Sequence, residues 1–168
     1  ANTASTPANI ISQSGPIVVT GETLLQAAST GDIVLTNAGN DFNRIDVINA
    51  RDASITDSDD LVLYGSVSPT NGVYYPFVVA RNLTVVAGGA ITDSSSYDPS
   101  AYISVTGGTA SFTAGSTNDV ILDNYYNQWN TIAFPSARNA QAGSYYANIN
   151  LGTSTMAGTL YLYGHNSY

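Results

Sequence analysis

The sequence predicts an all-β fold and, within that class, a parallel β-helix, or β-solenoid. Three observations lead to this prediction: short alternating runs follow one another, the runs recur at a steady spacing, and a long early segment is repeated later. Recurrence at roughly 20–22 residues is typical of solenoid coils, in which each strand stacks on the equivalent strand of the next coil.

The short runs are rich in β-branched and aromatic residues and are bounded by Gly, Asn, Asp or Ser, as strands and turns are. The segment nearest to helical periodicity is TLLQAAS, which Gly21 and Gly31 limit to the length of a strand. The predicted strands are NIISQS, PIVVTG, TLLQAA, DIVLTN, RIDVIN, DASITD, DLVLYG, FVVA, NLTVVA, AITDS, YISVTG, TASFTA, DVILDN, NTIAF, ANINLG and TLYLYG.

Residues 82–94, NLTVVAGGAITDS, show why the strands are short. Gly-Gly between apolar runs is a hairpin signal, but the second run is too short to pair well with the first. In a solenoid the chain stops each strand because it must turn a corner. We therefore interpret Gly88 and Gly89 as a corner, where glycine adopts a positive φ without a Cβ clash.

The internal repeat relates residues 17–47 to residues 103–134, with one inserted residue. We predict a single solenoid domain over residues 1–168, built of two related units at 8–87 and 88–164. The aligned positions include Ile17 and Ile103, Val19 and Val105, Thr23 and Thr109, Asp32 and Asp119, Leu35 and Leu122, Asn37 and Asn124, Asn40 and Asn127, Phe42 and Trp129, Asn43 and Asn130, with 10–14 matching 90–94 upstream and 60–65 matching 159–164 downstream.

A shorter period lies inside each unit, with Ile11, Ile33 and Ile55 at equivalent places. It predicts about 6–8 coils in the chain. An antiparallel β-sandwich is the rival fold, but it should show two-residue hairpin turns at wider spacing. The residues expected to face a common core are Val19, Leu35, Val47, Leu63, Val85, Val105 and Leu122.

Composition excludes several function classes. The chain has 168 residues, a net charge of −8, no cysteine and no lysine, and its four basic residues are arginines. A nucleic-acid binder needs a basic stripe, and an anionic membrane surface attracts one, so neither partner is expected. No apolar run is long enough to span a membrane, and no signal peptide is visible.

Residues 82–94, 105–124 (VTGGTASFTAGSTNDVILDN) and 31–43 (GDIVLTNAGNDFN) resemble the repeats of filamentous-haemagglutinin-type exoproteins of two-partner secretion. The resemblance implies a right-handed parallel β-helix, secretion to the bacterial surface, and roles in adhesion, aggregation or toxin delivery. Two inserts depart from plain shaft repeats because they are rich in Tyr and Pro: SVSPTNGVYYP (66–76) and SSSYDPSAY (94–102). The amino-terminal secretion domain of that family is not recognisable.

Few residues of the sequence are candidates for catalysis or metal binding. His165 is the sole histidine, so it has no partner for a His-based triad, and we expect a solvated side chain. Asp57, Asp59 and Asp60 offer oxygen ligands for calcium, although an Asp-rich stretch more often caps turns. Turn chemistry without a cofactor is the expectation, and calcium is the alternative.

Carboxylate pairs on a β-helix raise the question of a polysaccharide-cleaving enzyme, which needs two carboxylates flanking one bond. The candidate pairs are Asp52 with Asp57 and Asp119 with Asp123, and the second is not repeated in the other unit. We therefore expect no enzymatic activity.

Tyrosine is unusually frequent, with 12 residues, several of them adjacent. Neighbours in a strand face opposite ways, so one of each pair should point outward and offer contact area to a partner. Packing under the inserts or in ladders is the alternative. The candidate contact residues are Tyr74, Tyr75, Tyr97, Tyr125, Tyr126, Tyr145, Tyr146, Tyr161 and Tyr163.

The expected function is that of a structural and adhesive rod segment of a secreted, extracellular or cell-surface bacterial protein. A self-assembling extracellular filament subunit is the alternative, and a carbohydrate-active enzyme is a third. Neither end of the chain resembles a polar cap. The expected partners are therefore neighbouring repeats or another copy of the chain, and a host or cell-surface glycan or protein.

Overall fold

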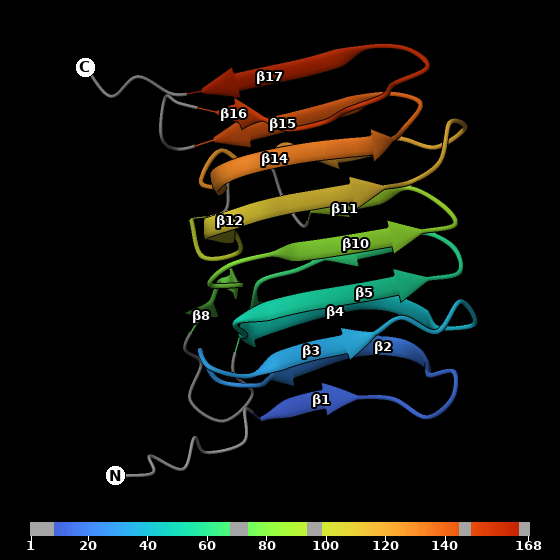
Figure 1. Cartoon of the computed structure of the whole chain (residues 1–168), viewed down its shortest axis with the longest axis vertical. Helices are drawn as coiled ribbons and strands as arrows, with labels where there is room; N and C mark the ends of the chain where they lie inside the picture. The colour runs from blue at the N-terminus through green and yellow to red at the C-terminus, as the bar shows by residue number, and fades with distance from the viewer. Residues whose placement is uncertain (1–8, 68–73, 94–98, 145–148, 165–168) are drawn as a thin grey trace, which may run out of the picture.

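The chain folds as a parallel β-solenoid of about six turns (Figure 1). This computed structural model describes residues 9–67, 74–93, 99–144 and 149–164, and its regular elements are all strands. No helix in these residues is long and apolar enough to cross a membrane. The all-β class and the solenoid are confirmed.

The strands stack in two sheets, and every pairing within each sheet is parallel. Sheet A contains β1 (Ile10–Ser12), β3 (Asp32–Leu35), β5 (Asp52–Asp57), β9 (Phe77–Val78), β10 (Leu83–Ala87), β12 (Ile103–Thr113), β14 (Gln128–Ser136) and β16 (Asn150–Leu151). Sheet B contains β2 (Val18–Gln26), β4 (Asp41–Asn49), β6 (Leu61–Leu63), β11 (Ile91–Asp93), β13 (Val120–Leu122), β15 (Ala140–Ser144) and β17 (Leu160–Gly164).

The one antiparallel pair in the described residues is β7 (Ser66–Val67) with β8 (Tyr74–Tyr75), which belongs to the first Tyr- and Pro-rich insert. The tips of both inserts, residues 68–73 and 94–98, lie outside the described residues. The parallel stacking excludes the antiparallel sandwich.

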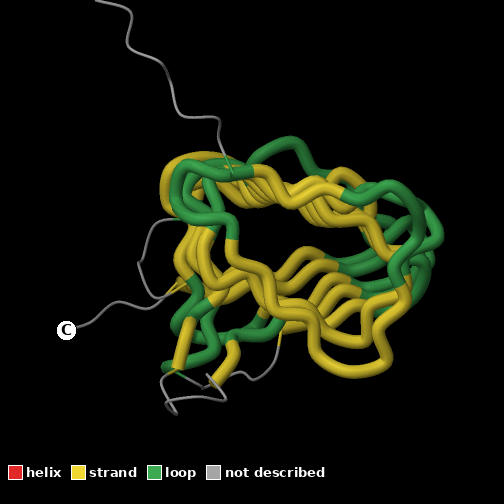
Figure 2. The backbone as a smooth tube through the Cα atoms, turned by 90° about the horizontal axis from the view of Figure 1, so that it is seen from below, coloured by secondary structure: helices red, strands yellow, loops and turns green. Residues whose placement is uncertain are grey.

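The long strands bend midway and so give the coil a third side, which Figure 2 shows along the stack. The register shifts where β2 passes Thr20 and Gly21, and again where β12 passes Gly107 and Gly108. The second halves of β2 and β4, strand β9, and the first halves of β12 and β14 form this side.

The predicted spacing of roughly 20–22 residues holds for both steps, but Ile55 is not the residue that stacks on Ile33. Ile11 pairs with Ile33 as expected, but Ile33 pairs with Ala53, and Ile55 pairs with Leu35. Coils differ in length because their corners differ, so a constant spacing in sequence does not fix the register.

The core runs along the inside of the coil. Of the seven predicted core residues, Val19 is partly buried against it and the others are fully enclosed. Phenylalanines are the largest of the fully buried side chains, and Phe112 contacts Trp129 edge-on with ring centroids 5.9 Å apart. The core prediction is confirmed.

Gly88 and Gly89 form a corner, as predicted, but not for the predicted reason. Their φ is not positive; among described residues the positive φ values belong to Ala28 and Gly115. A Cβ added to Gly88 would lie 2.1 Å from the carbonyl oxygen of Ser58 in the adjacent coil. Glycine is needed because the backbones of successive coils touch at this corner.

The two copies of the internal repeat lie on different sides of the coil. Strands β1, β2, β3 and β4 alternate from sheet A to sheet B, whereas their counterparts β11, β12, β13 and β14 alternate from B to A. The repeated segment is thus displaced by one side in the second copy. The unit boundaries at 8–87 and 88–164 stay a prediction.

Candidate functional site

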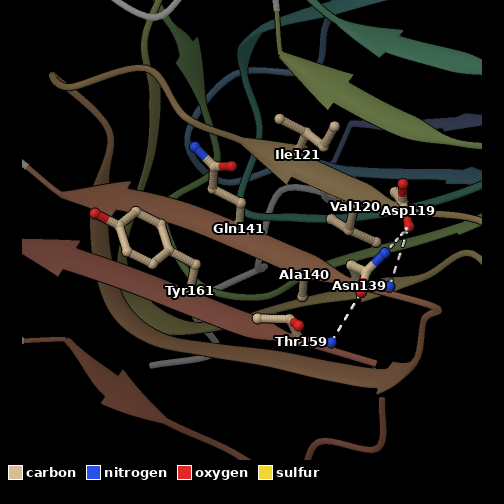
Figure 3. A pocket seen from close by; sticks show the side chains of 8 residues that line it. All are labelled: Asp119, Val120, Ile121, Asn139, Ala140, Gln141, Thr159 and Tyr161. Atoms are coloured by element: carbon tan, nitrogen blue, oxygen red, sulfur yellow. Dashed lines mark hydrogen bonds between the residues drawn. The ribbon is translucent and has the colours of Figure 1, made fainter. Parts of the chain in front are cut away.

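A shallow groove of about 210 Å³ crosses the outer face of sheet B (Figure 3). Alternate residues of a strand face outward, so the parallel register places Ile121, Gln141 and Tyr161 side by side on β13, β15 and β17. Ile121 is 37% exposed and Tyr161 is 58% exposed. The groove therefore presents an apolar surface next to a glutamine amide and a phenol.

A polar ladder borders the groove where these strands begin (Figure 3). Asp119 accepts hydrogen bonds through Oδ1 from the backbone N (3.1 Å) and Nδ2 (2.9 Å) of Asn139. Asn139 Oδ1 then accepts one from the backbone N of Thr159, at 2.8 Å. Each rung ties one coil to the next, so the ladder fixes the spacing of the groove-lining strands.

Asp119 is held as an anion. Arg138 donates to its two carboxylate oxygens from Nε at 2.8 Å and from Nη2 at 2.6 Å. These bonds and the Asn139 amide lower the pKa of Asp119 to about 2. A carboxylate with this pKa is a poor proton donor near neutral pH, and its lone pairs are already engaged.

The same ion pair occurs in the first copy of the repeat. Arg51 donates to Asp32 from Nε at 2.8 Å and from Nη2 at 2.5 Å, and Asp32 aligns with Asp119. Asp52 accepts from Arg81 and from Asn82 in turn. Sequence analysis missed the pairs Asp32–Arg51 and Asp119–Arg138. The signal was present, because in both copies the arginine follows the aligned aspartate by 19 residues.

The side chain of Asn40 makes several hydrogen bonds at the corner between β3 and β4. Its side chain is fully buried, and Nδ2 donates to the carbonyl oxygens of Leu35 and Thr56, each at 3.1 Å. Its Oδ1 accepts from the backbone N of Ile17 at 3.0 Å and from Nε2 of Gln13 at 2.7 Å. One amide thus joins three successive coils.

Asn127 repeats this arrangement in the second copy. It is fully buried, donates to the carbonyl oxygen of Leu122 at 3.3 Å, and accepts from the backbone N of Ile103 at 2.8 Å. Its remaining partner is Asp93, where the first copy has Gln13. Both corners stabilise the fold, and neither opens onto the groove.

The predicted calcium ligands do not converge. Asp57 is buried, with Oδ1 accepting from the backbone N of Phe42 and Oδ2 from that of Asp59, and burial raises its pKa. Asp60 is exposed and accepts from the backbone N of Ala90. In the described part of the chain, no three candidate ligand side chains are grouped to hold a metal ion. Calcium binding here stays a prediction.

The carboxylates considered for catalysis are separated by their partners. Asp52 and Asp119 are each bound by arginine, whereas Asp57 is turned into the corner next to Phe42. His165 lies outside the described residues. The absence of enzymatic activity stays a prediction.

The predicted tyrosines fall into distinct environments. Tyr161 is exposed in the groove, whereas Tyr163, on the same strand, is partly buried and donates a hydrogen bond to the carbonyl oxygen of Asp123. Tyr125 and Tyr126 are half-buried and contact each other edge-on, with centroids 5.1 Å apart. Tyr75 is also half-buried. The described part of the structure does not include Tyr97, Tyr145, Tyr146 or the side chain of Tyr74.

The groove thus combines one of the predicted tyrosines with residues that sequence analysis did not select. Ile121 and Gln141 were missed because strand alternation shows that a residue faces outward but not which coil lies above it. The register between coils decides which outward residues meet.

Comparison with known proteins gives one family. The family described as "Repeats of unknown function (DUF5649)" matches residues 1–49 and 50–134. No curated protein and no solved structure matches the chain. Since the match covers more than half of its length, the chain belongs to this family of repeats.

Proposed function

We propose that the chain is a stiff rod segment of a secreted bacterial surface protein, and that it contacts partners through the outer face of sheet B. The observation that carries the proposal is the tie between successive coils. Asn40 and Asn127 join neighbouring coils from inside, and the Asp119–Asn139–Thr159 ladder joins them from outside. Such cross-links resist bending and shear between coils, which is the mechanical requirement of a shaft.

Placement at the bacterial surface rests on the resemblance of residues 82–94, 105–124 and 31–43 to filamentous-haemagglutinin-type repeats. Charged residues make up 10% of the chain, and the outer faces display Thr, Ser, Asn and Gln next to isolated apolar residues.

The contact face is the groove around Tyr161. An exposed phenol beside an apolar side chain and a free amide is suited to the flat face of a sugar ring or to a protein side chain. A cell-surface glycan or protein is therefore the proposed partner. Asp119 does not repel it strongly because its charge is compensated by Arg138.

Binding to bacterial and host cell surfaces and to immobilised glycans tests this contact role. Tyr161→Ala should weaken binding about tenfold or more, the loss expected for an aromatic contact residue. Val18→Ala is the matched control, since Val18 is 64% exposed in the same sheet but lies in the second strand of the chain. Equal binding by both variants and the unmodified chain would show that the groove around Tyr161 is not the contact face.

A filament subunit is the second candidate, and the sheet edges favour it. Within the described residues, β17 pairs with β15 on one side and has no strand on the other, and β1 likewise pairs with β3 alone. Edges of this kind add further strands. Either the next coils of a longer chain or a second copy in head-to-tail contact would cover them, and the second arrangement builds a fibre.

Sedimentation velocity over a range of concentrations separates these two arrangements. A subunit that polymerises shows a sedimentation coefficient that rises with concentration. A constant value for a single elongated species at high concentration would contradict the filament candidate.

A further inference from the structure

The corners at Gln13 and Asp93 have the same plan but different chemistry. In the first copy, Gln13 Oε1 accepts from the backbone N of Asn37 at 3.1 Å and from Nδ2 of Asn40 at 3.0 Å. In the second copy, Asp93 Oδ2 accepts from the backbone N of Asn124 at 3.0 Å and from Nδ2 of Asn127 at 2.7 Å. Gln13 Oε1 and Asp93 Oδ2 therefore accept equivalent hydrogen bonds in the two copies.

The second polar atom differs between the copies. Gln13 Nε2 is a donor, and it reaches the carbonyl oxygen of Gly15 at 2.6 Å and Oδ1 of Asn40 at 2.7 Å. The corresponding atom of Asp93 is Oδ1, which is buried and has no hydrogen-bond partner among the described residues. An ionised carboxylate accepts hydrogen bonds but donates none, so it cannot replace the amide donor. A protonated carboxyl group can.

The surroundings of Asp93 also disfavour its negative charge. Burial is the main cause of a pKa raised to about 6, and the like charge of Asp123 acts in the same direction. Hydrogen bonds from Asn127, Asn124 and the backbone of Asp123 oppose the shift without cancelling it. Asp123, on the stretch that follows β13, is the charged side chain identified near Asp93 in the described residues.

We propose that Asp93 is a proton-binding site, at which protonation of Oδ1 makes the side chain of the corner after β11 neutral, as the Gln13 amide is in the corner after β1. The proton comes from solvent and no other bond changes. The corner is then neutral in mildly acidic surroundings, and above neutral pH it holds a buried carboxylate whose Oδ1 has no hydrogen-bond partner among the described residues. The solenoid thereby carries an acid-stabilised joint between β11, β13 and β14.

The sign of the pH dependence follows from linkage. Because the folded chain binds this proton more tightly than the unfolded chain, the contribution of Asp93 to stability is largest below pH 4 and falls as the pH rises. The fall runs from about pH 4 to about pH 6 and then levels off. Across this window the folding equilibrium constant should drop about 100-fold from this group alone.

Two variants and one spectrum test the site. Asp93→Asn places an amide donor at the corner, so its denaturant midpoint should change less than that of the unmodified chain between pH 4 and pH 7. Gln13→Glu is the reciprocal variant and should add a pH dependence of the same sign, because it places a carboxyl group at the equivalent half-buried corner position. The carboxyl carbon resonance of Asp93, titrated by NMR in the unmodified chain, should show a midpoint near pH 6.

An Asp93 resonance that titrates near pH 4 would overturn the proposal, whatever the variants do. Parallel pH profiles for the unmodified chain and Asp93→Asn would also overturn it. If Asp93→Asn fails to fold, the NMR titration of the unmodified chain decides the question without it.

Discussion

The side chains of Asn40 and Asn127 share two equivalent backbone hydrogen bonds in the two copies of the repeat, yet they lie at different crossings of the coil. At Asn40 the chain passes from sheet A to sheet B, and at Asn127 it passes from sheet B to sheet A. The repeat therefore encodes a corner and its two flanking strands, not a side of the solenoid. Any corner that can take a buried amide can host this unit.

Removing the buried amide should be costly. Asn40→Ala leaves the backbone N of Ile17 and the carbonyl oxygen of Leu35 without their side-chain partner inside the fold. We expect the free energy of unfolding to fall by about 2–4 kcal/mol, because each buried unsatisfied group costs about 1–3 kcal/mol. Chemical denaturation measures the change. Asn43→Ala is the control: Asn43 is exposed with one hydrogen bond to Thr20, and a comparable loss there would show that burial is not the cause.

Core and surface positions of one strand should differ sharply. Val85 is fully buried in β10, whereas its neighbour Val86 points outward and is 37% exposed. Val85→Ala should lower the free energy of unfolding by about 1–3 kcal/mol through lost packing and a residual cavity. Val86→Ala should change it by less than about 0.5–1 kcal/mol. Equal effects in thermal or denaturant unfolding would mean that the register of β10 is wrong.

Close approach of coils should make some glycines irreplaceable. Gly88→Ala would force a Cβ to within 2.1 Å of the Ser58 carbonyl oxygen, so the coils must separate at that corner. We expect a loss of about 2 kcal/mol or more, in the upper part of the range for overpacking. At Gly21 an added Cβ meets nothing within 4 Å, so Gly21→Ala should be nearly neutral. Similar unfolding midpoints for both variants would refute the contact at Gly88.

Ala28 and Gly115 both have a positive φ, so exchanging alanine and glycine at these two positions should affect stability differently. Ala28 has a φ of 62° and Gly115 a φ of 74°, a conformation that favours glycine. Ala28→Gly should stabilise the chain, or leave it unchanged, whereas Gly115→Ala should destabilise it by about 1 kcal/mol. Neither change removes a side-chain contact, since Ala28 is exposed and nothing lies near the Cβ of Gly115. A Gly115→Ala variant as stable as the parent would show that the backbone relaxes there.

Much of this architecture follows from the sequence, because short alternating runs bounded by corner residues determine a coil. The core positions from Leu35 to Leu122 could be predicted from alternation alone. The stacking order could not. Corners of different length change the length of individual coils, so Ile33 lies on Ala53 instead of Ile55, and the second copy is displaced by one side.

The groove was less accessible to prediction for the same reason. Tyr161 could be selected as an outward tyrosine, but its neighbours Ile121 and Gln141 come from coils whose register depends on the intervening corners. Pairing between coils is a long-range property, and the residues that set it, such as Asp119 and Arg138, act across the stack.

Electron microscopy of the protein in its native, full-length form tests the central proposal most directly. If this chain is a rod segment, the particles should be stiff and elongated, and each coil should add about 4.8 Å to their length. Antibody fragments against the face around Tyr161 should decorate the side of the rod. Compact particles in which that face is covered by another domain of the same chain would contradict the account.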